Sequence, residues 1–208
     1  MKGSVWGIVL AGGSGNRCGG LKQFELLGDR RVLDWSPAVP RAACDGVVVV
    51  IPAGVDERGA VKGGATRSGS LRAVLAEVPL AAEIVVVHDA ARPLAWREIC
   101  ERVVVAIRAG GQAAIPVVAV NEAIKRVEGV IVAESPDRST LVAVQTPQGF
   151  RASVLCEAHA TGAEATDDAA LVEAIGGKVV TGDGDRRNPK LIARDDVAVA
   201  LALLGRPS

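Results

Sequence analysis

Glycines and basic residues follow the first apolar run of the chain, and together they suit the binding of phosphate. The run Val5–Leu10 leads directly into Ala11-Gly12-Gly13-Ser14-Gly15-Asn16-Arg17, and Lys22 comes shortly afterwards. Glycines after a buried strand let backbone amides approach a phosphate chain, and Arg17 and Lys22 add positive charge. The alternative from these residues alone is a tight strand-to-helix turn whose basic side chains are merely solvated.

This loop matches neither of the two commonest nucleotide-binding fingerprints. A dinucleotide fingerprint requires glycine at Cys18 and a clearly placed acidic residue further on. A Walker A loop counted from Gly15 requires lysine at Leu21 and serine or threonine at Lys22. The sequence therefore indicates a nucleotide-phosphate loop of another kind.

A second polar set follows the apolar run Ile84–Val87, as His88-Asp89-Ala90-Ala91-Arg92-Pro93. Carboxyl ends of strands face the ligand crevice in a doubly wound sheet, so Asp89 is placed where a nucleotide's metal is held. One carboxylate together with phosphate oxygens is a usual way to bind Mg²⁺, and Arg92 is then placed to contact a phosphate. A helix cap or turn residue is the alternative for Asp89, and His88 is interpreted as structural.

Further polar residues lie late in the chain. They are Arg138, Gln145-Thr146-Pro147-Gln148, Thr166-Asp167-Asp168 and Asn188-Pro189-Lys190. Each alone suits a turn, a cap or a solvated charge. Only their joint order points to a site.

Short apolar runs that alternate with helical spacing predict the scaffold. The predicted strands are Val5–Leu10, Gly46–Ile51, Ile84–Val87, Ala113–Val120 and Lys178–Thr181. The predicted helices are Ser68–Val78, Trp96–Ala109, Ser153–His159, Asp167–Ile175 and Asp195–Leu204. This alternation predicts an open α/β sheet with helices on both faces.

Residues 121–144 depart from that rhythm. Ala123–Val127 and Val130–Glu134 are expected to be extended, with a turn at Glu128-Gly129. The result is a hairpin arm that projects from the sheet. An arm that cannot bury itself is expected to pack on a partner.

Length and composition limit the class of protein. The 208 residues fit one domain over 1–208, and 24 basic and 24 acidic side chains give zero net charge. That balance argues against a nucleic-acid binder. Cys18, Cys44, Cys100 and Cys156 form no C-x-x-C pair, so we expect neither a zinc site nor a redox pair. Glycines interrupt the first apolar run early, so we expect no signal peptide and no membrane span, and a cytoplasmic location.

In their order along nearly the whole chain, these motifs resemble the cytidylyltransferase family that acts on 2-C-methyl-D-erythritol 4-phosphate in the non-mevalonate isoprenoid pathway. The resemblance rests on Ala11-Gly12-Gly13-x-Gly15-x-Arg17, Lys22-Gln23-Phe24, Gly63-Gly64-x-x-Arg67-x-x-Ser70, His88 to Pro93, Asp137-Arg138, Gln145-Thr146-Pro147-Gln148-x-Phe150, Thr166-Asp167-Asp168-Ala169 and Asn188-Pro189-Lys190. It implies a Rossmann-like, mostly parallel sheet, and a hairpin arm that completes a neighbour's site in a homodimer. It also implies attack of a polyol phosphate on the α-phosphorus of CTP, with Mg²⁺ as cofactor and pyrophosphate as leaving group.

The resemblance implies roles for individual residues. Arg17 and Lys22 match catalytic residues that contact the triphosphate, and Arg138 and Lys190 match those that position the attacking phosphate. The nucleotide-binding positions are Ala11, Gly12, Gly13, Gly15, Gly64, Ser70 and Asp89, of which Asp89 also lies near Mg²⁺. The positions near the acceptor are Arg92, Arg138, Thr146, Thr166 and Lys190.

Some positions depart from the family's pattern. Ala123 stands where a threonine usually touches the substrate phosphate, while Gly12, Cys18 and Ala193 replace more usual residues. A cytidylyltransferase for another polyol phosphate, such as ribitol 5-phosphate, is therefore the alternative. A noncatalytic nucleotide-binding protein is an alternative of another class, whereas a sugar-1-phosphate nucleotidyltransferase would not explain Lys190 together with the arm.

Overall fold

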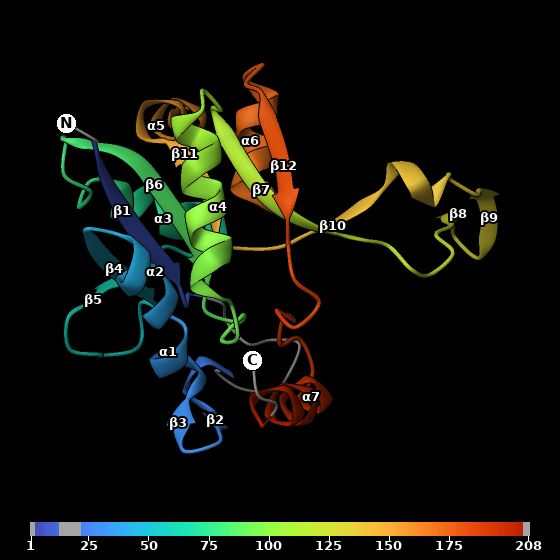
Figure 1. Cartoon of the computed structure of the whole chain (residues 1–208), viewed down its shortest axis with the longest axis horizontal. Helices are drawn as coiled ribbons and strands as arrows, with labels where there is room; N and C mark the ends of the chain where they lie inside the picture. The colour runs from blue at the N-terminus through green and yellow to red at the C-terminus, as the bar shows by residue number, and fades with distance from the viewer. Residues whose placement is uncertain (1–2, 13–21, 206–208) are drawn as a thin grey trace.

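A computed structural model describes residues 3–12 and 22–205 (Figure 1). The main sheet contains β1 (Ser4–Leu10), β4 (Gly46–Ile51), β5 (Ala60–Lys62), β6 (Ala82–Asp89), β7 (Ala113–Ala119), β10 (Val142–Val144), β11 (Gln148–Arg151) and β12 (Val179–Asp183). The helices are α1 (Val32–Trp35), α2 (Ala38–Ala43), α3 (Arg67–Leu75), α4 (Arg97–Arg108), α5 (Ala152–Ala160), α6 (Asp168–Ala174) and α7 (Arg194–Leu204). The described elements also include two small hairpins, β2 (Leu26–Leu27) with β3 (Arg30–Arg31) and β8 (Arg126–Glu128) with β9 (Ile131–Glu134). Two 3-10 turns are present as well, η1 (Lys22–Phe24) and η2 (Arg138–Thr140).

The main sheet is mixed, with strand order β10-β7-β11-β6-β1-β4-β5, and β12 pairs with β7. The strands β1, β4, β5 and β6 pair in parallel, as do β7 and β12. All five strands predicted from apolar runs are present. The predicted fold class, an α/β sheet with helices on both faces, is confirmed.

Alternating side chains of the central strands divide the core between the two faces of the sheet. Val85 and Val87 pack in one cluster with residues of α3, α5 and α6. Ile84 and Val86 pack in another, with residues of α2 and α4. This arrangement follows from the period of two in a strand, and it explains why β6 has no polar residue between Ile84 and Val87. Within the described ranges, no helix has both the length and the apolar character needed to cross a bilayer.

The strand β11 is the main departure from the predicted sheet. It lies between β6 and β7 and pairs antiparallel with both. The sequence indicated Gln148 only as part of a polar set, because four residues are too few to show a strand period. Phe150 of this strand is fully buried in the core.

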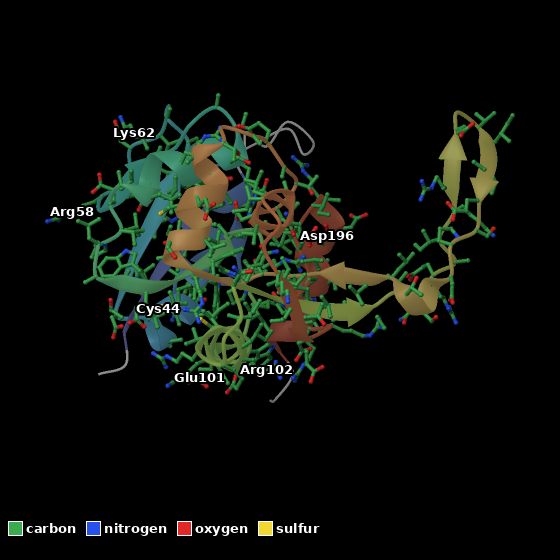
Figure 2. All side chains as sticks on the ribbon, turned by 90° about the horizontal axis from the view of Figure 1, so that it is seen from above. Cys44, Arg58, Lys62, Glu101, Arg102 and Asp196 are labelled. Carbon is green, nitrogen blue, oxygen red and sulfur yellow. The ribbon has the colours of Figure 1, made fainter. Side chains whose placement is uncertain are left out.

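The arm leaves the sheet after β7 and returns through β10, and both figures show it projecting well beyond the other elements (Figures 1 and 2). The hairpin is present, but two expected details were wrong. The first strand begins at Arg126 rather than Ala123, and the turn lies between Glu128 and Ile131, with Gly129 at a φ of 62°. Every residue of β8 and β9 is exposed.

Two cysteines that are distant in sequence meet where α2 packs on α4. A hydrogen bond between the side chains of Cys44 and Cys100, together with burial, raises the pKa of the Cys100 thiol above its ordinary value. Both residues belong to the apolar cluster on this face of the sheet. The sequence spacing, which showed no cysteine pair, did not predict this contact.

The insertion of β11 predicts a large stability loss for Phe150→Ala. Truncating a fully buried phenylalanine removes apolar burial and leaves a cavity, so the free energy of unfolding should fall by about 3–5 kcal/mol. Urea denaturation measures this change in the free energy of unfolding. Val105→Ala on the exposed side of α4 is the control and should change stability by less than about 0.5 kcal/mol. Similar losses in both variants would contradict the central packing of β11.

Candidate functional site

The candidate site lies where β1, β4 and β6 end and the chain turns away from the sheet. Ala11 follows β1, and its N–H donates to the carbonyl of Val50 at 2.7 Å. Ala90 follows β6, and its N–H donates to the carbonyl of Leu10 at 2.9 Å. These bonds continue the parallel ladder past the strands, so the first loop and the segment after Asp89 start side by side. Their relative position is therefore set by the sheet itself.

Asp89 is the centre of this site. Its carboxylate oxygens contact Nζ of Lys190 at 2.7 Å and the guanidinium of Arg67 at 3.3 Å. Burial opposes the charge on Asp89, but the charges of Arg67 and Lys190 outweigh it and lower the pKa of the carboxyl to about 2. Asp89 is therefore ionised at neutral pH although it is buried.

Arg67 extends the charged cluster into the core. Its second contact is with the fully buried Asp168, at 2.8 Å, and Oδ1 of Asp168 accepts a hydrogen bond from Nε2 of His159 at 3.1 Å. Burial opposes ionisation of Arg67, yet the two aspartates raise its pKa above the ordinary value. One arginine thus joins Asp89 at the edge of the sheet to an acid buried beneath it.

A second network fixes the backbone of Asp89. The N–H of Asp89 donates to Oγ1 of Thr146 at 3.0 Å, and this hydroxyl lies 3.1 Å from Nδ1 of His88. Nε2 of His88 lies 3.1 Å from the carbonyl of Arg92, so Nε2 carries the proton and Nδ1 accepts from Thr146. Burial lowers the pKa of His88 to about 4 despite the neighbouring Asp89. His88 is accordingly a neutral structural residue, as its sequence context indicated.

Arg92 links the segment after β6 to the segment that carries Lys190. Its guanidinium donates to the carbonyl of Asn188 at 2.8 Å and to that of Val144, at the base of the arm, at 3.1 Å. The fully buried side chain of Asn188 donates to the carbonyl of Thr146 at 2.9 Å. These bonds hold Lys190 opposite Asp89.

Glycines allow three segments to meet at Ser70. A Cβ on Gly12 would lie 3.0 Å from Oγ of Ser70, and a Cβ on Gly63 would lie 2.7 Å from it. At Gly64 a Cβ would lie 2.8 Å from the backbone of Gly69. Gly12, the segment after β5 and the start of α3 therefore lie too close together for a side chain larger than hydrogen at these glycines. Ser70 itself is buried and donates to the carbonyl of Thr66 at 2.8 Å.

Comparison with known proteins identifies the family of this chain. The family model for 2-C-methyl-D-erythritol 4-phosphate cytidylyltransferase, IspD, matches residues 5–206. This chain belongs to the IspD family. Among curated proteins, the bifunctional enzyme IspD/IspF of Anaeromyxobacter dehalogenans is 42% identical, over 98% of this chain and 58% of that protein. The chain thus spans little more than half the length of such relatives.

Solved structures support the same placement in the IspD family. The structural alignment with the 2-C-methyl-D-erythritol 4-phosphate cytidylyltransferase of Thermus thermophilus has a TM-score of 0.82 at 33% sequence identity. It covers 95% of this chain and 97% of the Thermus chain. The alignment with the 4-diphosphocytidyl-2C-methyl-D-erythritol synthase of Anaerococcus prevotii has a TM-score of 0.84 at 25% sequence identity. It covers 98% of this chain and 99% of the Anaerococcus chain. The similarity includes nearly all of each compared chain.

In this IspD family member, the structure brings together many of the residues that the sequence singled out. They are Ala11, Gly12, Gly64, Ser70, Asp89, Arg92, Thr146 and Lys190. The hydroxyl of Thr146 is engaged by Asp89 and His88. Contact of Thr146 with a substrate stays a prediction, and Thr166 is exposed just before the N-terminus of α6.

Other residues that the sequence singled out are not joined to the candidate site in the described part of the chain. Gly13, Gly15 and Arg17 lie outside the described residues, as does the side chain of Lys22, the first residue of η1. Arg138 lies on the arm, where it donates to the carbonyl of Asn121. Within a single chain, the structure therefore does not bring Arg138 to Asp89.

The connecting role of Arg67 was missed by sequence reasoning. The residue stands within the Gly63-Gly64-x-x-Arg67-x-x-Ser70 motif, but no role was assigned to it. The available signal was an arginine at the start of a helix that follows two glycines. Its partner Asp168 belongs to another quoted motif, and only the fold shows that the two meet.

The donor set of the site fits a magnesium ion only if a nucleotide supplies further ligands. Asp89 is ionised, and Mg²⁺ is commonly held by one or two carboxylates together with substrate phosphates. Among the described residues, no three histidine, cysteine or acidic side chains form a cage. Lys190 and Arg67 now contact Asp89, so a cation would have to share or replace one of these contacts.

The position of Arg67 predicts a strong destabilisation in Arg67→Met. This change leaves the buried Asp168 without its cation, and removing one partner of a buried pair costs about 3–5 kcal/mol. Arg97→Met is a matched control, since Arg97 is also the first residue of a helix and pairs with the exposed Glu101. Its cost should not exceed about 1 kcal/mol in chemical denaturation. Equal losses would show that Arg67 does not carry a buried ion pair.

Proposed function

We propose that this chain transfers a cytidylyl group from CTP to 2-C-methyl-D-erythritol 4-phosphate, giving 4-diphosphocytidyl-2-C-methyl-D-erythritol and pyrophosphate. Family membership supports the reaction, since the IspD family model matches residues 5–206. The observation that carries it is the pair of Lys190 and Asp89 where β6 ends, with Arg92 alongside. We place the reaction in the cytoplasm, as the composition predicts.

The chemistry needs charge and alignment more than proton transfer. The acceptor phosphate is already anionic, so it can attack the α-phosphorus in line while pyrophosphate leaves on the opposite side. His88, the histidine beside the site, is fully buried, and its pKa of about 4 keeps it neutral. Catalysis by this site therefore relies on cations that hold two anions together and stabilise the charge that develops on the phosphates.

Lys190 is suited to hold the attacking phosphate. Its side chain is 42% exposed, and its ammonium lies 2.7 Å from the carboxylate of Asp89. Asp89 therefore holds this cation at the mouth of the site, where an incoming phosphate can share it. When bound, Mg²⁺ would be held by Asp89 and the nucleotide's phosphate oxygens and would neutralise triphosphate charge.

The arm supports a homodimer as part of the proposal. An isolated two-stranded hairpin is marginal in water, and Val127, Ile131 and Val132 expose 56%, 70% and 55% of their surface. Apolar side chains on a projecting hairpin favour packing against another chain. A second copy related by a two-fold axis would receive the arm and present its own in return, which places Arg138 in the partner's site.

The reaction is tested by pyrophosphate release with CTP, Mg²⁺ and either 2-C-methyl-D-erythritol 4-phosphate or ribitol 5-phosphate. We expect turnover with the first acceptor and a loss of about 100- to 1000-fold in kcat/KM for Lys190→Ala, because one placed cation is removed. Lys178→Ala, exposed before β12, should keep full activity. Turnover with ribitol 5-phosphate alone would show that ribitol 5-phosphate, and not the proposed acceptor, is the substrate. If CTP binds but no pyrophosphate is released with either acceptor, a catalytic role with these acceptors is contradicted.

The shared site is tested by mixing two variants. Arg138→Ala and Lys190→Ala should each be nearly inactive, but a mixed dimer has one site with Lys190 from one chain and Arg138 from the other. Random exchange of chains should then restore about a quarter of the wild-type activity, because half of the dimers are mixed and each has one intact site. If the activity of the mixture equals the sum of the activities of the two separate variants, Arg138 does not act across the dimer.

A further inference from the structure

A pocket of about 260 Å³ lies apart from the charged cluster at Asp89. It is lined by residues of α1, α2, the segment before α4 and the end of α7, and it is partly open to solvent. Figure 1 shows α1 and α7 in the lower part of the view. Its walls include Trp35, Leu94, Trp96, Leu203 and Leu204. The residues that form the ion pairs of Asp89 are not part of this lining.

The lining is apolar and contains two large rings. The chain has only three tryptophans, and two of them, Trp35 and Trp96, face this one pocket. The guanidinium of Arg187 lies 4.6 Å from the centre of the Trp96 ring, but its charge is already paired with Asp185 at 2.9 Å. Nε1 of Trp35 donates to the carbonyl of Leu27 at 3.0 Å. The walls therefore favour a ligand that is apolar and carries no net charge.

The volume limits the size of the ligand. An engineered apolar cavity of about 150 Å³ in another protein stays dry and binds benzene. A pocket of 260 Å³ is larger than that cavity and suits about two fused rings. Flat rings also match the indole side chains, because offset or edge-on contact between aromatic rings adds to the burial of apolar surface.

Two segments of the chain contribute residues both to this pocket and to the candidate site. Pro93–Trp96 continues the segment that carries Asp89 and Arg92, and Arg187 comes shortly before Lys190. A ligand in this pocket would thus contact residues close in sequence to Arg92 and Lys190.

We propose that this pocket is a second ligand site, which takes a neutral planar molecule of about two fused rings. The proposal does not depend on the reaction assigned to the Asp89 cluster, because it rests on the lining and volume of a separate pocket.

The probe is quinoline, at a pH where it is neutral, and the readout is the set of three indole N–H signals of the ¹⁵N-labelled protein. The signals of Trp35 and Trp96 should shift in a saturable way. Trp6 is the internal control, because it lies on β1 against Gly46 and its signal should not move. Saturating CTP should leave the quinoline shifts unchanged, since the nucleotide is expected at the other site.

Two variants make the test specific. Ala38→Phe, at an exposed position of the lining, should fill the pocket and abolish the shifts without loss of thermal stability. Arg41→Phe, exposed on the same helix but not in the lining, should retain them. The proposal is overturned by equal shifts of Trp6, by displacement with CTP, by binding that survives in Ala38→Phe, or by no saturation below about 10 mM.

Discussion

The carboxylate of Asp89, held between Arg67 and Lys190, is the interaction on which the rest of the site depends. A buried charge is tolerated only when it is paired, so this one acid requires two cations from distant parts of the chain. Arg67 comes from the start of α3, and Lys190 from the segment before α7. The contacts of one carboxylate therefore connect the end of β6 with the start of α3 and the segment before α7.

Around that charge, hydrogen bonds hold the neighbouring segments, although Nε of Arg92 and Oδ1 of Asn188 are buried without a hydrogen-bond partner among the described residues. Thr146 and His88 fix the backbone of Asp89, and Arg92 and Asn188 fix the segment that carries Lys190. Each of these bonds restrains the segment that makes it, because a buried group that moved would lose its partner. The arm has the opposite character, since β8 and β9 are wholly exposed and lack a core. The molecule thus combines a hydrogen-bonded charged cluster at the edge of the sheet with a projecting arm whose strands are exposed.

Sequence alone predicted the parts of the fold that local pattern determines. The runs Val5–Leu10, Gly46–Ile51 and Ile84–Val87, which lie in β1, β4 and β6, have no charged residue, and Asp89 at the end of β6 is the acid at the centre of the site. Family resemblance implied that Asp89 and Lys190 belong to one site, but neither their ion pair nor the link from Arg67 to Asp168 was predicted. Both contacts join residues from distant elements, which no local period records. The strand β11 escaped prediction for a related reason: its four residues form a strand only because β6 and β7 each offer an edge.

The place of β11 also governs the order in which the chain is able to complete its sheet during synthesis. Although β6 and β7 are consecutive strands, they are separated by residues 148–151. When the ribosome has released β1, β4, β5 and β6, the outer edge of β6 still lacks its neighbour. It stays open until a segment some sixty residues later emerges. An open strand edge is a template for wrong pairing, so the interval before β11 arrives is when the nascent chain is most exposed to aggregation.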